Sequence, residues 1–216
     1  MKRSTFLRLA LATLAALVVT GASAQPYPNR PVRVIIPFPP GGTLDTLGRA
    51  LAQKLGEQTG QSFVVENRPG GNGIIGADVV AKAPADGYTL LFNASTFVTA
   101  PMTMKQVPYA VEKDFVPIAL VAKAPLSVSI AKDLPVTDIK SLIAYAKANG
   151  NKTTFAVGSI GSAGHLATEL LKRAGGIDYT VVPYKGTAPS FQDLLGGRID
   201  GFIDPILGSL AYHKAG

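Results

Sequence analysis

The sequence predicts an α/β protein with two lobes, each a mostly parallel β-sheet flanked by helices. Three observations predict this fold class. Short apolar, β-branched runs alternate with segments of helical periodicity along almost the whole chain, Pro and Gly clusters separate them, and the pattern changes between residues 94 and 125. Strand–helix–strand alternation favours parallel sheets, because each connection must cross over the sheet. The change of pattern predicts a crossing between two lobes.

Residues 1–24 have the composition of an export signal. Three basic residues begin the chain, an apolar run covers 9–19, and a small-residue cleavage site ends at Ala24, before Gln25. The run is shorter than the ~20 residues that cross a bilayer. We therefore expect cleavage near Ala24–Gln25, export, and no insertion of the mature chain into the membrane.

Residues 25–122 are expected to form the first lobe. Apolar residues three and four positions apart predict a helix that begins at Thr43 and is ended by Gly60. β-Branched runs on either side of it predict strands. The expected elements are strands over 32–36, 62–66 and 88–92 and helices over 43–59 and 74–83.

Residues 123–216 are expected to form the second lobe and the start of a crossing back. Strand-like runs at 115–122 and 126–131 lead into it, and Thr137 is the predicted N-cap of a helix that runs to Asn149. The later elements are strands over 153–157, 179–183 and 198–203 and helices over 163–174, 188–195 and 206–214. A Gly-closed helix normally leads to another strand, so we expect the C-terminal part of this fold to be missing after Gly216.

The segment 32–45 carries the strongest chemical signal. A β-branched strand runs into a Pro/Gly corner, and a helix begins directly behind it. Such a helix start presents backbone N–H groups without partners at the positive end of the helix dipole, which favours an anion. The chain repeats the device at Gly158–Ser162. Two loops of this kind facing one another would hold a small carboxylate.

The predicted ligand-binding residues lie where strands end and helices begin, the place where open α/β sheets bind ligands. They are Phe38, Pro39, Gly41, Gly42, Thr43, Asp45, Asn93, Ser95, Thr96, Gly158, Ser159, Gly161, Ser162, His165, Tyr184, Lys185, Gly186 and Asp204.

A purely structural role is the alternative at several of these positions. Asp45 lies in a first helical turn, where an acid often only complements the dipole, but it could also recognise a ligand ammonium or hydroxyl. His165 could donate to a carboxylate or satisfy a local cap. Lys185 could be a surface charge only, and the corner at 39–43 could be an ordinary helix-entry turn.

Composition and motifs disfavour other classes of protein. The 21 Lys and Arg residues are scattered rather than clustered, so nucleic acid is not an expected partner. The absence of cysteine, with only two histidines, excludes a His/Cys metal site. Val157 stands where a Gly-x-Ser-x-Gly nucleophile elbow needs glycine, and no phosphate-binding loop follows a strand. We expect neither an enzyme nor a resident metal or cofactor.

Six segments in order along the chain carry a family resemblance: 31–45, 64–70, 85–91, 161–167, 182–186 and 193–197. Together they resemble the Bug family, the TctC-like periplasmic solute-binding proteins of tripartite tricarboxylate transporters. The resemblance implies a two-lobed fold like that of type II periplasmic binding proteins. It also implies a monomer in the periplasm that binds a small carboxylate, largely through backbone N–H groups of both lobes, and delivers it to membrane permease subunits.

Two other interpretations stay open at this point. The same fold could serve as a periplasmic ligand-sensing module that docks on a signalling receptor. The chain could also be a non-functional truncated product, which the helix at its end suggests.

Overall fold

The computed structural model describes residues 26–215. The predicted export signal lies outside the described residues. No helix in the part of the chain that the structure describes is long and apolar enough to cross a membrane.

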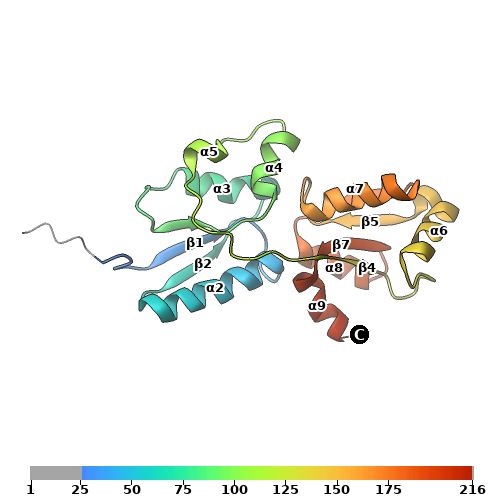
Figure 1. Ribbon diagram of the computed structural model, residues 1–216, viewed down its shortest axis with the longest axis horizontal. Coiled ribbons are helices and arrows are strands. Elements are labelled where there is room, and N and C mark those ends of the chain that lie inside the picture. Colours follow the sequence, from blue (N-terminus) through green and yellow to red (C-terminus); the bar gives the residue numbers. More distant parts are fainter. Residues whose placement is uncertain (1–25, 216) are drawn as a thin grey trace, which may run out of the picture. The chain divides into compact units, whose positions relative to one another are not determined.

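The first sheet is parallel and has the strand order β2–β1–β3 (Figure 1). Its central strand β1 (Val32–Ile36) is buried at four of its five residues, while β2 (Phe63–Asn67) and β3 (Thr89–Leu91) form the edges. Helix α2 (Thr43–Thr59) packs on β1 and β2, and α3 (Ile74–Ala81) packs on β1 and β3. The predicted parallel first lobe is confirmed.

Two short helices, α4 (Thr96–Thr103) and α5 (Val111–Asp114), follow β3. The strand expected over 115–122 does not form, and this prediction was wrong. A strand needs a hydrogen-bonding neighbour, and this segment has none within residues 26–215. Pro117 also removes a donor, and Val116 and Ile118 are 87% and 78% exposed.

The second sheet is mixed, with the strand order β4–β7–β5–β6. Strands β5 (Thr154–Val157), β6 (Thr180–Pro183) and β7 (Gly201–Pro205) are parallel, and β4 (Leu126–Ile130) pairs antiparallel with β7. The other elements are η2 (Gly71–Gly73), η3 (Gly150–Lys152) and the helices α6 (Ile139–Asn149), α7 (Ala163–Gly175), α8 (Thr187–Leu195) and α9 (Ile206–Ala215). The chain therefore has two α/β lobes, as the sequence predicts.

Most element boundaries differ from the prediction by one or two residues, and for two of the differences the structure shows a local reason. The N-cap of α6 is Asp138 rather than Thr137, because the Asp138 carboxylate accepts the Ser141 N–H at 2.7 Å in a capping box. Strand β7 begins three residues after the expected 198, because Arg198 N–H still bonds the Asp193 carbonyl in the turn that follows α8.

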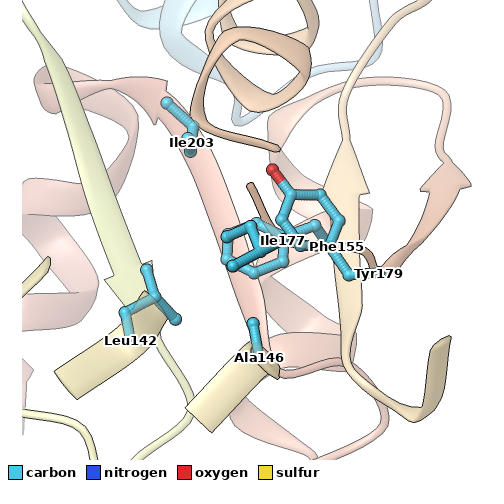
Figure 2. Packing of buried hydrophobic residues seen from close by; sticks show 6 residues of the cluster. All are labelled: Leu142, Ala146, Phe155, Ile177, Tyr179 and Ile203. Atoms are coloured by element: carbon cyan, nitrogen blue, oxygen red, sulfur yellow. The ribbon is translucent and has the colours of Figure 1, made fainter. Parts of the chain in front are cut away.

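The second sheet is held by one main apolar cluster, shown in Figure 2. Phe155 of β5 stacks on Tyr179 with ring centroids 4.5 Å apart, and Leu142 and Ala146 of α6 cover them. A smaller cluster around Phe191 and Phe202 joins α8 to β5 and β7. Burial of these side chains fixes the loops at the carboxyl ends of the strands, where the candidate site lies.

Candidate functional site

The first-lobe loop connects the buried end of β1 to the first turn of α2. Gly41 has φ +81°, a left-handed conformation that glycine adopts without strain, and it turns the chain into the helix. Gly42 is the N-cap and supplies no side-chain oxygen. Among residues 26–215 no acceptor bonds the N–H groups of Gly42 and Thr43. The start of α2 therefore presents unpaired donors at the positive end of its dipole.

The carboxylate of Asp45 holds this loop in place. It accepts hydrogen bonds from the Gly41 N–H at 3.0 Å, from Arg49 Nε at 3.0 Å and from Asn67 Nδ2 at 2.9 Å. Burial alone would raise the pKa of Asp45, but these hydrogen bonds outweigh it and leave the pKa below its ordinary value. Asn67 also donates to the Phe38 carbonyl at 3.0 Å. We infer that Asp45 positions the loop rather than contacting a ligand.

The start of α7 has a side-chain cap, unlike the start of α2. The Ser162 hydroxyl accepts the His165 N–H at 3.1 Å, and His165 Nδ1 accepts the Gly161 N–H at 2.9 Å. Within the predicted corner Gly158–Ser162, the N–H groups of Gly161 and Ser162 are therefore paired, and the ligand role of the corner stays a prediction. His165 thus takes the local capping role through Nδ1, and donation from its Nε2 to a ligand carboxylate stays a prediction.

The start of α8, in the second lobe, has no side-chain cap. Gly186 is its N-cap, with φ +121° and no capping side chain. The hydroxyl of Tyr184 donates a hydrogen bond to Asp193 Oδ2 at 2.6 Å. Burial, together with the Asp193 carboxylate, raises the pKa of Tyr184 to about 12. Lys185 is exposed. The open donors of the second lobe thus come from the 186–187 corner.

The two uncapped helix starts lie against one another. A Cβ placed on Gly42 would lie 3.6 Å from Thr187 Cβ, and one on Gly186 would lie 3.3 Å from Pro39 Cδ. A Cβ on Gly158 would lie 3.3 Å from the Gly186 carbonyl carbon. The predicted corners at 39–43, 158 and 186 therefore converge on one region.

A second contact joins the predicted Ser159 and Gly161 of the second lobe to Asn72 and Thr99 of the first lobe, two residues that sequence reasoning did not select. Asn72 Nδ2 donates to the Ile160 carbonyl at 2.6 Å, and the Ser159 hydroxyl bonds Asn72 Oδ1. Thr99 Oγ1 donates to the Gly161 carbonyl at 2.9 Å. Asn72 has φ +59°, and an Asn between glycines was the available signal, because Asn tolerates this conformation.

The side chains of the corner after β3 make few hydrogen bonds with the described residues. Asn93 Oδ1 accepts the adjacent Ala94 N–H at 2.8 Å, and the Ser95 side chain makes no capping bond to α4. Thr96 is 2% exposed, and its Oγ1 has no partner within residues 26–215. The ligand role of these three residues stays a prediction.

Asp204 ends β7 beside the helix starts. Its Oδ2 accepts a hydrogen bond from Thr187 Oγ1 at 2.9 Å. Burial raises the Asp204 pKa to about 7, although the Thr187 hydrogen bond acts in the opposite direction. A Cβ on Gly208 would lie 2.5 Å from Thr43 Oγ1 and 2.8 Å from Asp204 Oδ2, so the two oxygens flank the same point.

This chain is similar in sequence and in fold to known proteins. Residues 47–216 match the TctC family, described as tripartite tricarboxylate transporter family receptor. Protein BugT of Bordetella pertussis is 40% identical over 204 residues, which cover 92% of this chain and 62% of BugT. The structure of R. palustris Rpa4515 with adipate has 40% identity and a TM-score of 0.84, covering 88% of this chain and 64% of that one.

A further solved structure, MatC from Rhodopseudomonas palustris with bound malate, has 30% identity and a TM-score of 0.78. It covers 88% of this chain and 65% of its own. The chain thus spans less than two thirds of the length of each of these proteins. The match over most of the chain and the shared fold lead to one conclusion: the chain belongs to the TctC family of tripartite tricarboxylate transporter receptors.

Proposed function

We propose that this chain binds a small organic carboxylate in the periplasm and delivers it to permease subunits of a tripartite tricarboxylate transporter. The observation that carries the proposal is the pair of uncapped helix starts, one from each lobe. A Cβ built on Gly42 of the first lobe would lie 3.6 Å from Thr187 Cβ of the second, and no side chain caps either helix start. A carboxylate matches such donors in charge and in shape.

Family membership supports this chemistry. Rpa4515 is described with adipate and MatC with malate, and both are carboxylates. The proposal assigns direct ligand contact to the 39–43 and 186–187 corners and to Asp204, with Gly158–Ser162 bordering them. It takes the lobes as 25–122 and 123–216 and the protein as a monomer that performs no catalysis.

The mechanism we propose is closure of the lobes around the ligand. The Asn72–Ile160 and Thr99–Gly161 hydrogen bonds form only when the loops of the two lobes meet. A ligand bound by both helix starts would favour that arrangement, and the closed form would dock on the permease.

Thermal unfolding with a panel of carboxylates tests the proposal. At 100 times its Kd, a ligand adds ~2.7 kcal/mol of stability and raises the midpoint by roughly 5–10 °C for a chain of this size. The decisive variant is Gly42→Asp, which places a carboxylate at the N-cap of α2 and competes with the ligand. We expect it to remove the ligand-induced rise while keeping the chain folded.

Gly42→Ala is the matched control. It adds a methyl group at an ordinary 3.6 Å from Thr187 Cβ and brings no charge, so we expect it to retain at least part of the rise. A folded chain whose midpoint none of the carboxylates raises would contradict the proposed function.

A further inference from the structure

Asp204 lies in a polar cluster that both lobes build. Thr187 Oγ1 donates to its Oδ2, and Thr43 Oγ1 from the other lobe lies on the far side of the same point above Gly208. Thr43 is only 9% exposed, and its Oγ1 has no partner within residues 26–215. The cluster therefore holds a buried hydroxyl without a partner and a carboxylate with one neutral donor.

The surroundings of Asp204 lack a compensating cation. Among the described residues no Lys, Arg or His forms an ion pair with it, and its Oδ1 accepts no hydrogen bond. Asp204 is 9% exposed. The carboxylate of Asp45, in the first turn of α2, instead accepts hydrogen bonds from Arg49, Asn67 and Gly41.

A buried carboxylate with a single neutral partner costs stability, and an apolar side chain would fold better in its place. Groups that carry such a cost are concentrated at functional sites. Asp204 lies beside the two uncapped helix starts. This destabilising carboxylate is therefore located where the proposed ligand would lie.

We propose that Asp204 determines ligand specificity by accepting a hydrogen bond from a hydroxyl or ammonium group that the bound carboxylate carries. The inference rests on the proposed function. The backbone N–H groups of the helix starts donate hydrogen bonds to the ligand carboxylate. Asp204 Oδ1 accepts a hydrogen bond from the ligand's hydroxyl or ammonium group. Above about pH 7, where Asp204 is ionised, a ligand without a donor leaves Oδ1 unpaired, and a second ionised carboxylate placed there would be repelled.

Matched ligands that differ only in the donor group test this inference. The probes are three sets of acids measured by titration calorimetry on the full chain: succinate, malate and aspartate; glutarate, 2-hydroxyglutarate and glutamate; adipate and 2-aminoadipate. A hydrogen bond to a charged group predicts that wild type binds the donor-bearing acids of one length roughly 10- to 100-fold more tightly. Asp204→Asn is expected to reduce that preference to less than about threefold.

Asp133→Asn is the matched control, because it removes an exposed carboxylate from the loop after β4 and should keep the preference. Asp204→Ser is a second variant whose hydroxyl can still accept from Thr187, should the amide disturb folding. Equal binding of donor-bearing and donor-free acids by wild type, or an unchanged preference in both Asp204 variants, overturns this inference and leaves the proposed function standing. Failure of wild type to bind any of the acids overturns both.

Discussion

Asp204→Asn gives a sharp test of the burial described for the end of β7. Burial raises the Asp204 pKa from the ordinary value of 3.8 to about 7. The folded chain therefore holds this proton more tightly than the unfolded chain. The contribution of this proton to the free energy of unfolding is complete below about pH 4. It is lost as pH rises toward 7, because the folded state must then bury the ionised Asp204 carboxylate.

The size of the effect follows from the pKa difference of about 3 units. At 1.36 kcal/mol for each unit, ionisation costs wild type up to about 4 kcal/mol, and the asparagine variant has no such cost. Urea unfolding of both proteins from pH 4 to pH 8 measures it. In the difference between the free energies of unfolding of wild type and Asp204→Asn, the contributions of the other titrating groups cancel. This difference should shift by several kcal/mol in favour of Asp204→Asn as pH rises.

A pH-independent difference would refute the reasoning, because Asp204 would then titrate alike in the folded and unfolded chains. Asp138→Asn is the control of opposite sign. The Ser141 N–H lowers the pKa of the exposed Asp138, so wild type gains from this group above the unfolded pKa and loses the gain as pH falls. Asp138→Asn should therefore be less stable than wild type at neutral pH, with a gap that closes in acid.

Three other predictions concern packing and loop order. Gly164→Ala should cost roughly 1–3 kcal/mol in urea unfolding, because its Cβ would lie 2.2 Å from the Ile203 carbonyl oxygen and α7 would have to move from β7. Gly56→Ala, in α2, should instead stabilise by roughly 0.5–1 kcal/mol, since the nearest atom lies 3.4 Å away; a loss there would contradict the packing. Asp45→Asn should speed amide hydrogen exchange at Gly41 and weaken carboxylate binding, and unchanged exchange would argue against the loop-holding role.

The elements of regular structure were predictable because their signals are local. β-Branched runs mark β1 and β5, and the leucine spacing with Gly60 at its end marks α2. The run at 115–122 has the same composition as a strand, but strand formation depends on a neighbour that local sequence does not supply. The two-lobed α/β class followed from the alternation of these signals.

The site was predictable in position but not in its pairing. Glycine corners predicted the strand-to-helix loops that the structure shows, and their ligand role stays a prediction. Sequence alone could not tell that Ser162 and His165 cap α7 themselves while Gly186 leaves α8 open, since a serine beside a helix start can cap it or face a ligand. It also missed Asn72, whose partner Ile160 is distant in sequence.

The central claim is that backbone donors of both lobes bind the carboxylate, and backbone amide NMR shifts test it most directly. Titration with the acid that gives the largest thermal shift should move the amide signals of Gly42, Thr43 and Thr187 most, with smaller changes at Gly161 because its N–H is already bonded to His165. Shifts confined to other regions, with those three amides unmoved, would contradict it.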